Sequence, residues 1–159
     1  MLRLNRMTEY AIVVLGALAH RHGDVVATAH LAALTGLAQP TVAKVSKFLL
    51  AADLVETQRG VRGGYRLTKA PVNISLVDIV EAMEGPIAVT DCVDGSQDPC
   101  AVRDRCFMNN HWNHVNLAIR NALNDVSLKN LIDPVQSFSL PVSPSITEDD
   151  RQFSRQQSA

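Results

Sequence analysis

Residues 28–67 combine two short helices, a tight turn and a basic hairpin, and this combination constrains the fold most. Thr28 is expected to cap a helix that ends at Gly36, with Leu31 and Leu34 facing inward. A further helix begins near Pro40, and apolar spacing predicts its inner face: Val42, Val45, Phe48, Leu49 and Ala52. Two short helices joined by such a turn are the signature of a helix-turn-helix.

The segment that follows is typical of a β-hairpin. Residues 54–58 alternate between apolar and polar, residues 59–64 are basic and glycine-rich, and alternation resumes over 65–67. Arg59 and Arg62 then lie at the hairpin tip. The glycines are expected to let the backbone approach a duplex closely. The sequence therefore predicts a mainly α fold, a winged helix-turn-helix with a two-stranded wing.

Helices are also predicted on both sides of this unit. One runs from about Asn5 to His20, and another from a capping box at Ser75 to Met83, before Gly85 and Pro86. A longer helix over 108–126 carries an apolar stripe that exceeds the needs of one small domain, which favours a homodimer: Trp112, Val115, Ala118, Ile119, Ala122 and Leu123.

These elements divide the chain into four parts. Residues 1–84 form the predicted DNA-binding domain, and 85–107 a cysteine-bearing, cluster-binding loop. Residues 108–132 form a dimerisation helix, and 133–159, rich in Ser, Pro and Gln, a disordered tail.

Charge is distributed unevenly along the 159 residues. The formal net charge is only −1, but residues 39–69 hold six Lys or Arg against two acids, a local excess of +4. A basic recognition helix and wing together suit double-stranded DNA, whereas an amphipathic helix taken alone is more often a solvated face. The candidate DNA-binding residues are Thr28, Gln39, Thr41, Lys44, Lys47, Arg59 and Arg62.

The three cysteines of the chain, Cys92, Cys100 and Cys106, lie within fifteen residues in a polar loop. The chain shows no secretory leader or membrane span, and an odd cysteine count argues against a disulfide framework, so we expect a cytoplasmic protein. Three thiolates suit an iron–sulfur cluster or Zn²⁺, but no Cys-x-x-Cys pair typical of structural zinc is present. No nucleotide-binding loop or nucleophile elbow indicates an enzyme.

In order and spacing, these motifs resemble the IscR/NsrR family of iron–sulfur-cluster-dependent winged-helix regulators. The resemblance covers about residues 2–132 and is greatest to regulators of SUF cluster-assembly genes. It rests on the residues 2–4, 10–11, 59–60, 63–67 and 79–86, the cysteines and Trp112. The resemblance implies a homodimeric repressor that senses cluster status, redox stress or nitric oxide through a [2Fe–2S] or [4Fe–4S] cluster. The alternative is a zinc-stabilised winged helix without cluster sensing.

The resemblance also implies cluster ligands. Cys92, Cys100 and Cys106 match the family's three cysteines, with seven residues instead of five between the first two. The fourth ligand differs, because Asn109 stands where one branch of the family has histidine. Glu9, at the place of an aspartate ligand from the partner subunit in another branch, is the candidate. The alternatives are His111, His114, a small-molecule ligand or a site with three cysteines alone.

Overall fold

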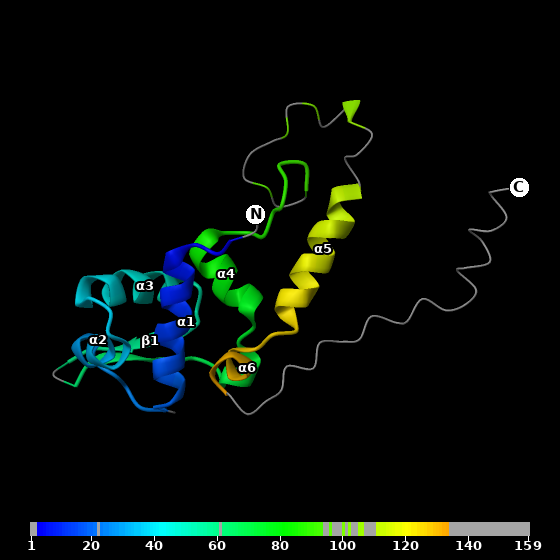
Figure 1. The fold of residues 1–159 in the computed structure, drawn as a ribbon. Coiled ribbons are helices and arrows are strands. Elements are labelled where there is room, and N and C mark those ends of the chain that lie inside the picture. Colours follow the sequence, from blue (N-terminus) through cyan, green and yellow to red (C-terminus); the bar gives the residue numbers. More distant parts are fainter. Residues whose placement is uncertain are drawn as a thin grey trace, which may run out of the picture.

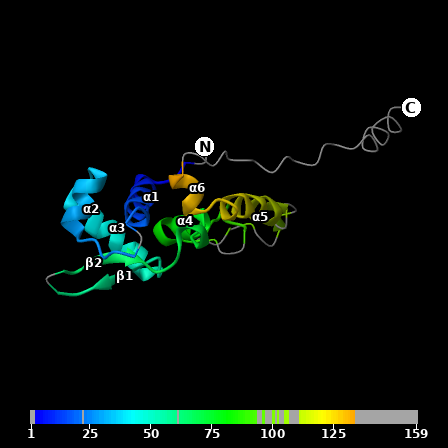
Figure 2. The ribbon, with the colours of Figure 1, turned by 90° about the horizontal axis from the view of Figure 1, so that it is seen from below.

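The computed structural model describes residues 3–21, 23–60, 62–93, 96, 100, 102, 105, 106 and 111–133. Helix α1 (Arg6–Ala19) lies near the middle of the helical domain, between a helix-turn-helix with its wing on one side and α4 (Leu76–Glu84) on the other (Figure 1). Helix α5 (His111–Asn124) lies at the end opposite the wing in both ribbon views (Figures 1 and 2). The mainly helical winged fold expected from the sequence is confirmed.

The core forms around α1. The Asn5 side chain caps this helix by accepting a hydrogen bond from the Met7 N–H at 3.0 Å. One face of the helix is buried against the surrounding elements, and removal of these side chains from water is the main stabilising contribution. The core includes Ala11, Val14, Leu15 and Leu18 of α1, and Leu31, Val42, Val45, Leu49, Leu54, Ile74, Ile79 and Leu128 from the other elements.

The helix-turn-helix consists of α2 (Thr28–Thr35) and α3 (Gln39–Ala51). Gly36 ends α2 in the left-handed conformation at φ 72°, and Pro40 lies in the first turn of α3, both as predicted. Ala27, not Thr28, is the N-cap residue of α2, and no side chain caps this end.

Three predicted core positions are wrong. Leu34 is 45% exposed and Phe48 is 42% exposed, and Ala52 is exposed as well. The helices are short and packed on one side only, so their buried stripes are narrower than the apolar spacing suggested.

The wing is an antiparallel hairpin of β1 (Val55–Gln58) and β2 (Gly64–Leu67), extended by a bridge between Val26 and Tyr65. A Cβ atom on Gly64 would lie 2.3 Å from the Val26 carbonyl oxygen, which leaves no room for a side chain. We expected the wing glycines to serve approach to a duplex. Gly64 instead serves approach to the protein's own backbone.

Gly64→Ala should therefore destabilise the domain by about 2–4 kcal/mol, because the new methyl group displaces the Val26 backbone from the wing. Chemical denaturation followed by circular dichroism measures the change. The exposed Thr57 on the neighbouring strand provides the control Thr57→Ala. Equal stability of Gly64→Ala and wild type would contradict the close approach.

Helix α4 begins at the predicted capping box, in which Ser75 and Asp78 bond each other's backbone N–H groups. Helix α5 is linked to it by an ion pair between Arg120 and Glu81, with Nη1 and Oε1 2.8 Å apart. The longer helix expected over 108–126 is found as α5, and residues 108–110 lie outside the described residues. The chain leaves the helical conformation after Asn124 and starts α6 (Leu128–Ile132) at a second capping box, Ser127 with Asn130.

Helix α6 packs back on α1, and Leu128 is fully buried in the core. The end of the described chain therefore packs on the helical core around α1. The tail beyond Asp133 lies outside the described residues, as does Asn109. None of the described helices is long and apolar enough to cross a membrane.

Candidate functional site

The outer face of α3 carries the predicted base- and phosphate-contacting side chains. Gln39, Lys44 and Lys47 are exposed, whereas Thr41 is half-buried at the same end of the helix. Thr28, also half-buried, lies at the start of α2, which packs on α3. The structure therefore groups these residues on one unit, with α3 presenting its donors outward.

The wing adds two exposed cations. Arg59 and Arg62 are exposed near its tip, while Arg66 of β2 is paired with Glu56 directly across the hairpin. Among the described residues, no acidic side chain forms an ion pair with Arg59, Arg62, Lys44 or Lys47. Unpaired cations on a helix and a neighbouring hairpin can neutralise phosphates without first breaking an internal contact.

The cysteines differ in their surroundings. All three are free thiols, but Cys92 is only 8% exposed, whereas Cys100 and Cys106 are half-buried. Within the described part of the chain, which includes all three, no three His, Cys, Asp or Glu side chains converge on a possible metal position. The separation of these side chains is compatible with a metal or cluster site, because thiolate ligands usually come together only when the metal binds.

The donor set fits a soft metal centre. Three free thiols in one short stretch can supply three thiolate ligands to an iron–sulfur cluster or to zinc. Glu9 is exposed in the first turn of α1, and His111 and His114 are exposed in the first turn of α5. Within the described residues, none of these three belongs to a group of three or more His, Cys, Asp or Glu side chains that could hold a metal ion.

Asn116 fixes the segment that leads into the cysteine loop. This nearly buried residue of α5 accepts a hydrogen bond from the Val89 N–H at 3.1 Å and donates one to the Ile87 carbonyl at 2.9 Å. The sequence interpretation missed it, although a polar residue between Trp112 and Ile119, within an apolar stripe, was an available signal. The path of the chain toward Cys92 is thereby set by α5.

Glu84 fixes the other end of the same segment. Its carboxylate, at the end of α4, accepts hydrogen bonds from the Asn5 N–H at 2.9 Å and from the Thr8 hydroxyl at 2.5 Å. Thr8 is fully buried, and Glu9 is the next residue of α1. The start of the first helix and the start of the cysteine-bearing segment therefore share one carboxylate.

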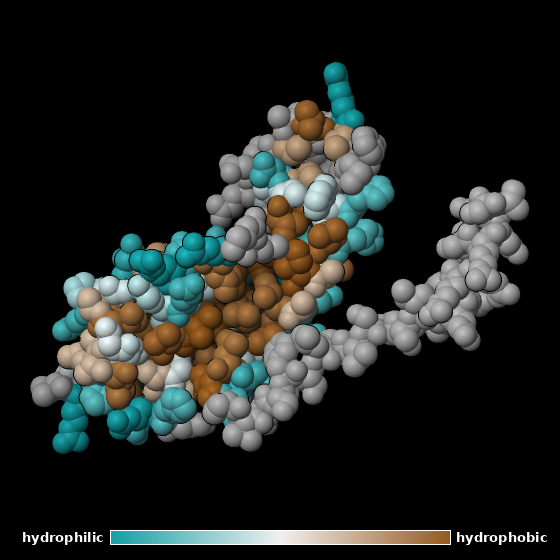
Figure 3. Space-filling model, in the orientation of Figure 1, coloured by the Kyte–Doolittle hydropathy of each residue, from teal (hydrophilic) through white to brown (hydrophobic). Residues whose placement is uncertain are grey.

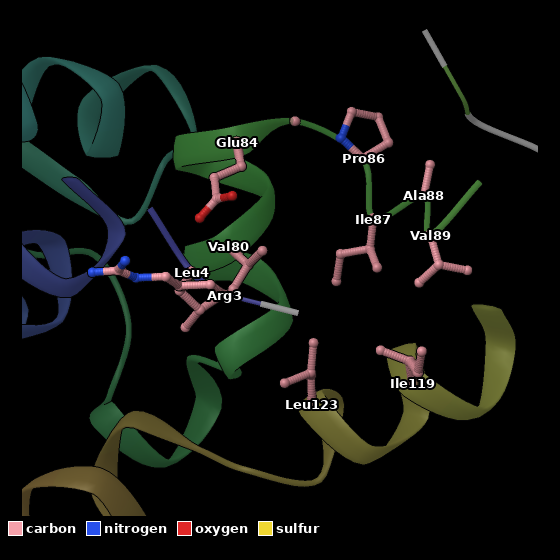
Figure 4. A pocket seen from close by; sticks show the side chains of 11 residues that line it. Arg3, Leu4, Val80, Glu84, Pro86, Ile87, Ala88, Val89, Ile119 and Leu123 are labelled. Carbon is pink, nitrogen blue, oxygen red and sulfur yellow. The ribbon is translucent and has the colours of Figure 1, made fainter. Parts of the chain in front are cut away.

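A cavity of about 530 Å³ lies beside the segment 85–89 (Figure 4). Val80 and Glu84 of α4, Pro86 to Val89, and Ile119 and Leu123 of α5 line it together with Arg3 and Leu4. Figure 3 shows a broad apolar area over the middle of the visible face. The segment 85–89 is thus held by polar contacts above a loosely filled space.

Comparison with known proteins decides the family. The sequence profile of Rrf2, described as an iron-dependent transcriptional regulator, matches residues 4–134. The chain belongs to the Rrf2 family. It is 31% identical over 123 residues to Protein aau3 of Rhizobium meliloti, covering 77% of this chain and 75% of that protein. It is 27% identical over 132 residues to the transcriptional regulator NsrR of Bacillus subtilis, covering 82% and 90%.

A solved structure agrees with this assignment. CymR, the global cysteine regulator of B. subtilis, matches with a TM-score of 0.63 and 25% identity, covering 83% of this chain and 97% of CymR. The protein is thus an Rrf2-family helix-turn-helix transcriptional regulator. Its relatives are regulators rather than enzymes, and DNA is the partner that this class of protein binds.

Asn116→Ala should release the segment 87–89, because the Val89 N–H and the Ile87 carbonyl lose their partner. We expect a loss of about 1–3 kcal/mol in unfolding free energy. Amide hydrogen exchange at Val89 should become faster, as read by mass spectrometry or NMR. Asn121→Ala, at an exposed position of the same helix, is the matched control. Unchanged exchange at Val89 in Asn116→Ala would show that the bond does not hold this segment.

Proposed function

We propose that this Rrf2-family protein is a cytoplasmic repressor whose DNA binding responds to an iron–sulfur cluster held by Cys92, Cys100 and Cys106. The observation that carries the proposal is the position of Glu84, which joins the start of the cysteine-bearing segment to the first helix of the DNA-binding domain. The family description as iron-dependent supports it. The resemblance to regulators of SUF genes supports iron–sulfur assembly genes as targets.

DNA recognition is assigned to α3 and the wing. Gln39, Thr41, Lys44 and Lys47 would approach bases and phosphates in a major groove, with Thr28 at the start of α2 beside the backbone. Arg59 and Arg62 would contact phosphates or the adjacent minor groove. The support is the common exposure of this helix and wing and the absence of ion pairs at their cations within the described residues.

A cluster, when bound, supplies a centre that oxidants, nitric oxide or iron shortage can alter or remove. Glu9 is the proposed fourth ligand, donated to the partner's cluster. A carboxylate oxygen binds the iron of a cluster less strongly than a thiolate does, so Glu9 should be the ligand that exchanges most readily. Any movement of the segment after α4 would then reach Asn5 and Thr8 through Glu84, and α1 packs directly on α3.

Homodimerisation is proposed on the apolar area that includes α5. Val115 and Leu117 of this helix are 44% and 54% exposed. Exposure of apolar side chains to water is unfavourable, so a partner surface that covers them would be stabilising. A twofold dimer would place two copies of α3 in successive major grooves about 34–36 Å apart. A small change at α1 could then lower the affinity for a palindromic operator strongly.

Anaerobic purification tests the cluster. Wild type should be brown and contain iron and acid-labile sulfide. Cys100→Ala should contain neither, with its helical circular dichroism retained, because Cys100 lies outside the core. Glu9→Ala should hold a cluster that is lost faster to a chelator. A colourless wild type with stoichiometric zinc would replace the sensor by a zinc-stabilised winged helix.

Arg59→Ala should weaken binding to an operator selected by the wild-type protein, because a phosphate-contacting cation is lost. We expect about tenfold lower affinity and a salt slope smaller by about one. Fluorescence anisotropy at several salt concentrations measures both. Lys129→Ala, in α6, is the control and should bind like wild type. Equal affinity of Arg59→Ala and wild type would remove the wing from the interface.

A further inference from the structure

The hydroxyl of Thr90 lies beside the sulfur of Cys92. Thr90 Oγ1 and Cys92 Sγ are 3.2 Å apart, within hydrogen-bonding distance for sulfur. A turn places them there, in which the Val93 N–H donates to the Thr90 carbonyl at 3.4 Å. Cys92 and Val93 are both buried, at 8% and 2% exposure, so the contact is shielded from water.

Contacts on both sides of the pair support this arrangement. Val89, the residue before Thr90, is bound through its backbone N–H to Asn116 of α5. Val93, after Cys92, is buried. The Thr90–Cys92 pair is therefore positioned by the residues on either side of it, and Cys92 is more deeply buried than Cys100 and Cys106.

While Cys92 is a thiol, either Thr90 Oγ1 or Cys92 Sγ can donate the hydrogen bond. Once Cys92 is a cluster ligand, only the Thr90 hydroxyl can donate it. A cysteine that binds iron is a thiolate without a proton, so the hydrogen bond must then run from the Thr90 O–H to the sulfur. Hydrogen bonds to ligand sulfurs withdraw electron density from the iron and raise the reduction potential of a cluster.

We propose that Thr90 is a positioning residue that donates a hydrogen bond to the Cys92 ligand and sets the reduction potential of the bound cluster. The inference rests on the cluster of the proposed function and concerns its tuning. Because one electron added to the cluster increases the negative charge on its sulfur ligands, the donated bond stabilises the reduced state more than the oxidised state. Loss of the hydroxyl makes reduction harder.

Thr90→Val tests this with little change in shape, since a methyl group replaces the hydroxyl. Thr90→Ser keeps the donor, and Thr57→Val makes the same replacement on the wing. The cluster-loaded, full-length proteins are titrated anaerobically with dithionite and redox mediators, and their iron and sulfide contents are measured first.

We expect Thr90→Val to hold the cluster with a reduction constant about tenfold lower, which is 59 mV for a one-electron couple. Its sulfur-to-iron absorption bands should move to longer wavelength, while Thr90→Ser and Thr57→Val remain close to wild type. A Thr90→Val potential equal to that of wild type would overturn the inference and leave the proposed function intact.

The remaining outcomes also test the role of the Thr90 hydroxyl. Equal shifts in Thr90→Val and Thr90→Ser would attribute the effect to packing and overturn the role of the hydroxyl. A Thr90→Val protein without iron, beside a loaded Thr90→Ser, would overturn tuning in favour of a need for the hydroxyl in assembly. A wild type that binds no cluster would remove the proposed function and this inference together.

Discussion

The carboxylate of Glu84 ties the end of α4, where the segment leading to the cysteines begins, to the start of α1. It accepts hydrogen bonds from Asn5 and Thr8, at the start of the helix around which the core is built. Thr8 is fully buried, so its hydroxyl has no water to replace this partner. The carboxylate therefore gives the first helix a fixed relation to the segment that leads to Cys92.

The same segment is fixed a second time, by Asn116 of α5. Between the two attachments, the chain passes over a cavity lined mainly by apolar side chains rather than over a filled core. Tight packing resists small displacements, whereas a loosely filled space tolerates them. The winged helix thus has a filled core, whereas the segment 85–89 is held mainly by polar contacts beside the cavity.

Much of this fold follows from sequence alone. Gly36, Pro40 and the Ser75–Asp78 capping box determine local backbone geometry, and each acts as predicted. Leu34 and Phe48 were misassigned because apolar spacing does not show how much of a short helix is covered. Glu84 and Asn116 were missed because their partners are backbone or hydroxyl groups 27–79 residues away, which no local pattern reveals. The convergence of the cysteines stays a prediction.

The most direct test is the affinity of wild type and Glu84→Ala for one selected operator, each with the cluster loaded and with it removed. The account predicts that the two forms of wild type differ by about 5–150-fold, the range of ordinary allosteric coupling, and that the difference largely disappears in Glu84→Ala. Iron content and thermal stability, measured on the same samples, establish that both proteins are loaded and folded. Equal affinities of the two wild-type forms would contradict the account. The account would also be contradicted by a Glu84→Ala protein that holds its cluster and shows the same difference in operator affinity as wild type between the loaded and cluster-free forms.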